Sequence, residues 1–409
     1  MSQPTPSKPR QTPLPNTFKE SRWQLFLIFT QLGLSSFGGP VAHLAYFRAE
    51  FVARRKWMSE ASYADLVALC QFLPGPASSQ VGMAIGIFRH GYIGALLAWL
   101  GFTLPSALLL MVFALAITHY QAYIPNGVLQ GLKIATVAVV AQAVWAMYKS
   151  LCKGWAGTLL MLTGAACTTV LTGGLSQAGI IAMAGIIGFL FFKTARPNKQ
   201  EALPVFISHK SALICLLLFV VLLIGLPLTA QLLPYKALID FSLFYHAGAL
   251  VFGGGHVVLP LLQTDLVASG QTSSNTFLAG YGAAQAVPGP LFRFAAFVGA
   301  SMRQDTTGIT GGLLALVAIF TPSFLLVAGA LPFWLKLRSN AQLSAALTGI
   351  NAAVVGLLLA AFINPVWTSA IHTPSHFVMA ALAYIALVYA RVAPWLLVVG
   401  CGVLGWVGN

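Results

Sequence analysis

A chain of 409 residues with 58% hydrophobic and only 7% charged residues is too apolar for a soluble domain, which carries roughly 25% charged residues. The 22 Lys and Arg residues outnumber the 8 Asp and Glu residues, a balance that could indicate a nucleic-acid partner. The basic residues stand in short clusters between long apolar stretches, as in the cytoplasmic loops of membrane proteins. We therefore expect a lipid bilayer as the partner and no nucleic acid.

The first segment, residues 1–20, is rich in proline and carries basic side chains without an apolar pattern. This composition predicts a disordered tail. No small-residue cleavage site precedes the Phe-Gly-Gly-Pro element at 37–40, which argues against a cleaved signal peptide. The tail is expected to be retained on the cytoplasmic side.

Two apolar segments follow, 23–51 and 63–88, and each is interrupted near its middle. The first contains Gly-Gly-Pro at 38–40, and the second contains Pro-Gly-Pro at 74–76. Proline removes a backbone donor and glycine permits tight turns, so each element ends one helix and starts another. Each arm has about 11 to 16 residues, too few to cross a bilayer at about 1.5 Å per residue. We predict broken or re-entrant helices with their breaks near mid-membrane.

Further apolar runs predict membrane-spanning helices. The longer runs match the roughly 20 helical residues that a bilayer core requires, whereas the shorter ones are marginal. In chain order they are 91–119, 127–148, 155–170, 177–192, 212–233, 308–335, 342–362, 377–390 and 395–407. Between them, 241–266 and 276–302 are interrupted in the same way as the first two segments.

The two halves of the chain repeat each other at an offset of about 215 residues. Four motifs recur in register: Phe-Gly-Gly at 37–39 and 252–254, Gln-x-x-Pro-Gly-Pro at 71–76 and 285–290, Phe-Thr with Pro-Ser at 102–106 and 320–323, and an Ala/Val run at 137–140 and 352–355. The prediction is an all-α polytopic membrane protein of two homologous halves, 21–199 and 237–409. A connecting segment with one span, 200–236, joins them.

The basic residues test the orientation of the two halves. With the tail inside and the first two broken segments re-entrant, most of the 22 Lys and Arg residues fall on the cytoplasmic side. The span at 212–233 then starts the second half outside, which inverts it relative to the first. Ordinary spans with a different count also satisfy the charge bias, and they remain the alternative to re-entry.

The breaks are the predicted substrate site. The half-helices that begin at Ala77 and Leu291 present unpaired N–H groups and a partial positive charge, which bind anions. Such groups must face protein or a water-filled cavity in a membrane. A structural kink is the alternative, because Gly and Pro are common in transmembrane helices, but recurrence in both halves favours a functional interpretation.

Two basic side chains fall within predicted membrane segments. Arg293 follows the second Pro-Gly-Pro element in the first turn of a half-helix, where a charge costs about 2.5 to 3.5 kcal/mol in lipid, so it should face a cavity or a partner. It is the first candidate for an anion ligand, and the alternative is a structural charge bound to carbonyl groups. Lys133 is a weaker candidate, because it could extend to the outer interface.

Other polar side chains near the breaks are candidate ligands. His43 and His256 follow the two Gly-rich breaks and could donate hydrogen bonds or carry protons, although a single His is usually a packing residue. Gln71 and Gln285 precede each Pro-Gly-Pro and could bind the anion or cap broken backbone. Ser78 lies at the start of the first half-helix. Asp65 is expected at the lipid interface, with proton coupling as the alternative.

The paired motifs, Phe-Gly-Gly-Pro or Phe-Gly-Gly-Gly-His followed by Gln-x-x-Pro-Gly-Pro, resemble those of the chromate ion transporter family in its long, two-domain form. The resemblance covers most of the chain from Trp23 onward. It implies a bacterial inner-membrane protein that exports chromate and confers resistance. The first break has Gly-Gly-Pro where the second has Gly-Gly-Gly, so the halves need not contribute equally. The positions implied for the site are Gly38, Gly39, Pro40, Pro74, Gly75, Pro76, Gly253, Gly254, Gly255, Pro288, Gly289 and Pro290.

A secondary transporter for chromate is the expected class, with sulfate or another small oxyanion as the main competing substrate. A channel would share the pore without alternating access. No HExxH motif, nucleophile elbow or Walker element occurs, so neither an enzyme nor an ATP-driven pump is expected. The five cysteines lack paired spacing, and no metal or cofactor is expected. A homodimer is an open alternative for the assembly.

Overall fold

The computed structural model describes residues 20–119, 125–171, 174–192, 207–233, 235–267, 269–302 and 308–407. All regular secondary structure in these ranges is helical, which confirms the predicted all-α class. The predicted tail, apart from its last residue, lies outside the described residues. Four of the Lys and Arg residues between the apolar segments also lie outside the described ranges: Lys193, Arg196, Lys199 and Arg303.

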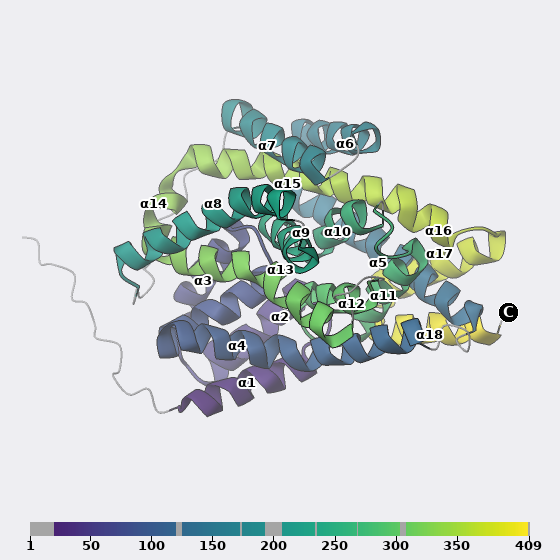
Figure 1. The fold of residues 1–409 in the computed structure, drawn as a ribbon, viewed down its shortest axis with the longest axis horizontal. Helices are drawn as coiled ribbons and strands as arrows, with labels where there is room; N and C mark the ends of the chain where they lie inside the picture. Colours follow the sequence, from purple (N-terminus) through teal and green to yellow (C-terminus); the bar gives the residue numbers. More distant parts are fainter. Residues whose placement is uncertain are drawn as a thin grey trace, which may run out of the picture.

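The first half contains seven labelled helices (Figure 1). They are α1 (Arg22–Ser35), α2 (Gly39–Arg48, continued by a π-helix, Ala49–Arg54), α3 (Glu60–Phe72), α4 (Ala77–His119), α5 (Asn126–Leu151), α6 (Gly154–Val170) and α7 (Gly174–Phe191). Serine side chains fix where two of them begin, because Ser21 accepts a hydrogen bond from Gln24 N and Ser59 accepts one from Ser62 N. The connecting helix α8 (His209–Leu232) follows.

The second half repeats this order of helices. It comprises α9 (Lys236–Leu250), α10 (Val258–Leu266, preceded by a 3₁₀ turn, Gly255–Val257), α11 (Ser274–Ala286), α12 (Phe294–Ser301, preceded by a 3₁₀ turn, Leu291–Arg293), α13 (Gly308–Ala330), α14 (Trp334–Ser339), α15 (Ala341–Ala361), α16 (Thr368–Ala370), α17 (Pro374–Val388) and α18 (Pro394–Val407). All the apolar runs predicted as spans form helices, and all four segments predicted as broken are broken.

Each half-helix folds back on the long helix that follows it. An elbow at His90–Gly91 divides α4 into a first arm, 77–89, and a second arm, 92–119. A Cβ on Gly86 would lie 2.3 Å from the carbonyl oxygen of Gly94, so the two arms cross with their backbones in contact. The second half has the same crossing, because a Cβ on Gly299 would lie 2.4 Å from the carbonyl oxygen of Gly311. The fold-back is therefore a property of both halves.

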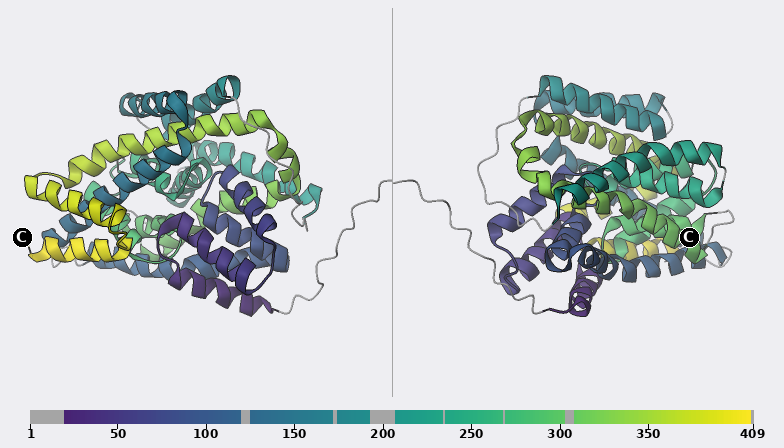
Figure 2. Two further views of the ribbon diagram at one scale, coloured as in Figure 1. Left: turned by 180° about the vertical axis from the view of Figure 1, so that it is seen from behind. Right: turned by 60° about the vertical axis from the view of Figure 1, so that its left-hand side comes forward.

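The two halves do not form separate lobes, because helices of each half pack against helices of the other. Helix α15 of the second half packs against α6 and α7 of the first, and α5 packs against α17 and α18 of the second. Figures 1 and 2 show α6 and α7 lying along α15 at one edge of the molecule. Glycines permit these close approaches: a Cβ on Gly349 would lie 2.2 Å from Ala184 O, and one on Gly131 would lie 2.0 Å from Cys401 O.

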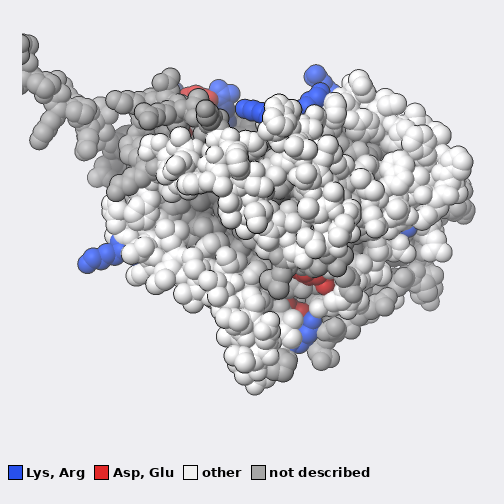
Figure 3. Space-filling model, turned by 90° about the horizontal axis from the view of Figure 1, so that it is seen from above, with Lys and Arg blue, Asp and Glu red and all other residues white. Residues whose placement is uncertain are grey.

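The outer surface is suited to lipid. Within the described ranges, five helical segments are long and apolar enough to cross a bilayer. They are Ala77–His119, Asn126–Leu151, His209–Leu232, Gly308–Phe333 and Ala341–Ala370. Large apolar side chains such as Leu213, Leu217 and Ile224 of α8 are exposed. Figure 3 shows a face almost free of charged side chains, with the few visible ones mostly near its margins.

Candidate functional site

Two backbone hydrogen bonds bring the four breaks together. Gly75 N donates to Val251 O at 2.7 Å, and Gly289 N donates to Ser36 O at 2.9 Å. Each bond joins the Pro-Gly-Pro element of one half to the Gly-rich break of the other. The two bonds are related by the sequence repeat, since Gly75 corresponds to Gly289 and Ser36 to Val251. The two pairs also touch each other, because His43 Nδ1 lies 3.3 Å from the hydroxyl of Ser78 and a Cβ on Gly255 would lie 3.4 Å from Leu291. All four breaks therefore meet around an internal pseudo-two-fold axis.

Only glycine fits at the centre of each Pro-Gly-Pro element. Gly75 has φ 122° and Gly289 has φ 107°, which other residues rarely adopt. A Cβ on Gly75 would lie 2.6 Å from the hydroxyl of Ser323, and one on Gly289 would lie 2.8 Å from that of Ser106. Sequence reasoning did not assign these two serines to the site. Their position in the repeated Phe-Thr…Pro-Ser motif was the signal.

The first half-helix begins directly at its break. Its first backbone bond runs from Gln80 N to Pro76 O, so the N–H groups at 77–79 have no partner within the helix. The Gln80 side chain turns back and donates from Nε2 to Pro74 O at 2.6 Å. Gln80 therefore binds a carbonyl group that the break leaves free, a role that sequence reasoning did not assign to it.

His43 lies beside this half-helix. Its Nδ1 is 3.3 Å from the hydroxyl of Ser78, and its ring packs edge-on against Phe102. The side chain is buried, and its Nε2 has no hydrogen-bond partner in the described structure. His43 is also close enough to Arg293 for the two side chains to interact electrostatically. It thus links the first half-helix to the basic group of the second.

Arg293 is turned back toward its own break. The residue is 1% exposed, and its guanidinium group donates to Pro290 O at 2.8 Å, to Ala284 O at 2.7 Å and to Val287 O. These carbonyl groups lie at the end of α11 and in the break. Pro290 O also accepts a bond from Arg293 N at 3.2 Å, whereas Ala284 O and Val287 O depend on the guanidinium. None of the ion pairs among the described residues involves Arg293, and its Nε has no partner. The side chain both stabilises the break and leaves an uncompensated positive charge at its centre.

The corresponding groups of the second half have different partners. His256 Nδ1 lies 2.7 Å from the hydroxyl of Tyr281 on α11, a buried residue that sequence reasoning missed. Gln285 is half-buried and its Nε2 has no partner, whereas Gln71 is exposed at the end of α3. The two histidines and the two glutamines are therefore not equivalent in this structure.

Lys133 lies away from the breaks. Its Nζ donates to Asn275 Oδ1 at 3.1 Å and to Ser369 O at 3.0 Å, and the side chain is 7% exposed. Asn275 stands at the start of α11, about 16 Å along the helix axis from the break at its other end. The structure thus brings Arg293 and His43 together at the breaks and places Lys133 at the far end of α11.

Unpaired polar atoms gather where the breaks meet. Buried polar groups in proteins are nearly always hydrogen-bonded, so exceptions mark sites for water or ligands. Among the described residues, several of the buried side-chain atoms without a partner are on or next to the breaks: Ser36 Oγ, His43 Nε2, Ser79 Oγ, Gln80 Oε1, Gln285 Nε2, Arg293 Nε and Ser323 Oγ. Most of these can donate a hydrogen bond. The arrangement is suited to a small polar anion.

A polytopic all-α protein whose broken helices meet in its interior belongs to the class of membrane transporters with discontinuous helices. The family model described as chromate transporter matches residues 23–189 and again residues 240–406. The chain therefore belongs to the chromate transporter family, which confirms the resemblance found in its motifs.

Similar proteins cover most of the chain. A chromate transport protein of Pseudomonas aeruginosa is 30% identical over 94% of this chain and 91% of the relative. A probable chromate transport protein of Synechococcus elongatus is 29% identical over 83% of each chain. A chromate transport protein of Cupriavidus metallidurans is 24% identical over 94% of this chain and 92% of the relative. These names support transport rather than catalysis. No solved structure matches the chain.

Proposed function

We propose that the protein exports chromate across the bacterial inner membrane as a secondary transporter, and that the dianion binds where the four breaks meet. The observation that carries this proposal is the group of unpaired buried donors around the two backbone bonds from Gly75 and Gly289. Three of the relatives bear names that include chromate transport, which supports chromate as the substrate.

The donors are of the kind that a tetrahedral dianion requires. Arg293 supplies positive charge and a free Nε–H, and the N–H groups at 77–79 point from a helix N-terminus. The hydroxyls of Ser36, Ser79 and Ser323 add neutral donors from three different elements. Since the donors come from both halves, the bound anion would contact both halves, and its affinity would depend on their relative position.

The membrane potential can supply the energy for export. Moving one charge across 100 mV corresponds to about 2.3 kcal/mol, so a dianion leaving a negative-inside cell gains about 4.6 kcal/mol. Uniport is therefore sufficient. Exchange for a proton or another anion is the alternative mechanism.

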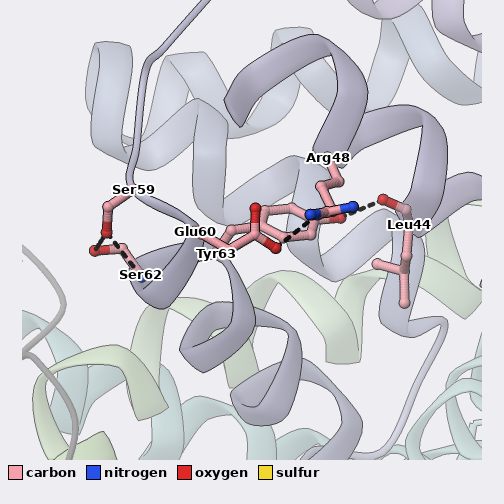
Figure 4. A network of polar contacts seen from close by, with 6 residues as sticks. All are labelled: Leu44, Arg48, Ser59, Glu60, Ser62 and Tyr63. Carbon is pink, nitrogen blue, oxygen red and sulfur yellow. Dashed lines mark hydrogen bonds and ion pairs between the residues drawn. The ribbon is translucent and has the colours of Figure 1, made fainter. Parts of the chain in front are cut away.

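The proposed orientation places at the cytoplasmic face the tail, the start of α1, the end of α2 with its π-helix, the start of α3 and the elbow of α4. Basic and acidic side chains tie these ends together: Arg48 to Glu60 and Arg55 to Glu50, each at 2.6 Å, and Arg89 to Glu20. Figure 4 shows the first of these pairs. Because these ends share one cluster, they lie on one side of the membrane, and the excess of basic residues favours the cytoplasm.

Uptake of labelled chromate into everted vesicles tests the proposal. We expect saturable uptake that an interior-positive potential stimulates and an ionophore abolishes, because everted vesicles accumulate what the cell exports. Vesicles without the protein are the control, and excess unlabelled sulfate should compete only weakly. Uptake of labelled sulfate without uptake of chromate would replace the substrate, and flux that does not saturate would indicate a channel.

A further inference from the structure

The helices α3 and α11 are repeats of each other but are packed differently. In α11, all residues from Phe277 to Ala284 are buried. In α3, one face is exposed along its whole length. It begins at Glu60, which is paired with Arg48, and continues with Ala61, Ala64, Ala68 and Gln71. The last four residues form the part of the face between the first turn and the break. The repeat offset relates these four residues to Asn275, Leu278, Gly282 and Gln285 of α11. The internal symmetry is therefore broken at this pair of helices.

Helix α5 covers the middle of the α11 face, where Leu278 and Gly282 are buried, whereas Asn275 is exposed and Gln285 is half-buried. A Cβ on Gly282 would lie 2.7 Å from Leu132 O and 2.8 Å from the hydroxyl of Thr136. Thr136 donates to Leu278 O at 3.2 Å, and Lys133 donates to Asn275 at 3.1 Å. The repeat counterpart of α5 is α15, and α3 has no comparable packing against it.

The exposed face of α3 does not resemble a surface in contact with lipid. It contains no large apolar side chain, whereas α8 exposes Leu213, Leu217 and Ile224 among others. Three alanines and a glutamine are typical of a helix face that meets water or another helix closely. Gln71, at the inner end of this face, stands three residues before the first Pro-Gly-Pro element. The face therefore leads to the breaks.

The cytoplasmic end of α3 is fixed to α2. Tyr63 donates from its hydroxyl to Leu44 O at 2.6 Å, and Glu60 pairs with Arg48 at 2.6 Å, as Figure 4 shows. Helix α3 also packs against α4. A movement of α3 would thus carry α2 with it.

We propose that the exposed face of α3 lines the path by which the anion reaches the breaks from the cytoplasm, and that this face closes on α15 when the site opens outward. The direction of the path rests on the function proposed above. The closed contact follows from the repeat: Ala68 would pack against Leu347 and Asn351, as Gly282 packs against Leu132 and Thr136. The amide of Asn351 would then donate to the backbone of Ala64.

The same symmetry identifies what must open on the other side. The bonds from Thr136 and Lys133 to α11 hold the outer half closed in this structure. Lys133 corresponds to Thr348 in α15, whose hydroxyl bonds within its own helix. The closed outer contact between α5 and α11 therefore has one hydrogen bond, from Lys133, that the proposed cytoplasmic contact between α3 and α15 would lack. This difference favours the conformation that is closed on the outer side.

Cysteine accessibility tests the path. In a background with the five native cysteines replaced and membrane insertion verified, Ala68→Cys should react with a charged, membrane-impermeant maleimide from the cytoplasmic face. We expect labelling about ten-fold faster than that of Leu278→Cys, which is buried on α11, or of Leu217→Cys, which faces lipid. Saturating chromate should slow the reaction. Labelling of Ala68→Cys only from the outer face, or as slowly as in the two controls, would overturn the proposal.

A cross-link tests the closure. With molecular oxygen and a copper–phenanthroline catalyst as the oxidant, the two thiols of the double variant Ala68→Cys with Leu347→Cys should form a disulfide during turnover that stops transport, and a reductant should restore transport. Absence of the cross-link in a labelled, transporting variant would overturn the closing movement. Labelling does not depend on the substrate, so an accessible Ala68→Cys in a protein that carries no chromate would reject the proposed substrate and keep the path. Chromate transport by a variant whose Ala68→Cys is inaccessible would keep the proposed substrate and reject the path.

Discussion

Replacing Gly289 by alanine is expected to reduce chromate transport by about a hundred-fold while the protein still enters the membrane, since small displacements of a site have effects of that order. The new Cβ would sit at φ 107° and lie 2.8 Å from the hydroxyl of Ser106 and 3.3 Å from Nη1 of Arg293. Backbone strain of this kind costs about 1 to 3 kcal/mol. The cheapest relief is a shift of the break, which would weaken the bond from Gly289 N to Ser36 O.

The test compares transport rates per amount of membrane-inserted protein. Gly75→Ala should behave similarly, because its φ is 122° and a Cβ would lie 2.6 Å from Ser323. Gly225→Ala on α8 is the matched control, since nothing lies within 4 Å of a Cβ there. Gly289→Ala with transport close to that of the control would show that the meeting of the breaks does not form the site.

Sequence alone predicted the breaks because a short run of consecutive residues determines each one. Pro-Gly-Pro at 74–76 and 288–290 ends one helix and starts the next, and the structure has helix boundaries at both places. Hydropathy predicted the spans for the same reason, since a lipid-facing helix such as α8 is apolar over most of its length.

The packing of helices of one half against helices of the other could not be predicted from consecutive residues or from hydropathy. The contacts of α15 with α6 and α7 depend on Gly349, Gly356 and Gly188, which are scattered among other small residues of the chain. A small residue permits a close approach without specifying the partner helix. Asp65 gives a second example: it was expected at the lipid interface, and it is 1% exposed. Its depth along α3 followed from the sequence, but the face on which it lies did not.

For Arg293 the sequence left two interpretations, an anion ligand or a charge bound to carbonyl groups. The structure shows the carbonyl contacts, which hydropathy and motif spacing do not reveal because Ala284 and Val287 accept through their backbones. The unpaired Nε keeps the first interpretation as a proposal. A substitution that separates charge from geometry is needed to distinguish the two roles.

Arg293→Met is expected to abolish transport, and Arg293→Lys to retain a small part of it. Methionine leaves the carbonyl groups of Ala284 and Val287 without their donor, at a cost of about 1 to 3 kcal/mol for each group that water does not reach. Pro290 O keeps its bond from the backbone N–H at position 293. Lysine keeps the charge, but its ammonium group lacks the planar fork that serves several acceptors at once. Arg54→Met is the control, since that side chain is 61% exposed and its ion pair contributes little.

Thermal unfolding in detergent, with and without chromate, separates the two roles of Arg293. If the guanidinium contacts the anion, Arg293→Lys should lower the unfolding temperature and also reduce the stabilisation by chromate, because binding to the native state is what raises it. If Arg293→Lys unfolds earlier but is stabilised by chromate as strongly as the unsubstituted protein, the guanidinium only supports the break. The dianion would then be held by the half-helix N–H groups and the hydroxyls of Ser36, Ser79 and Ser323, and serine substitutions should remove the chromate effect that Arg293→Lys leaves intact.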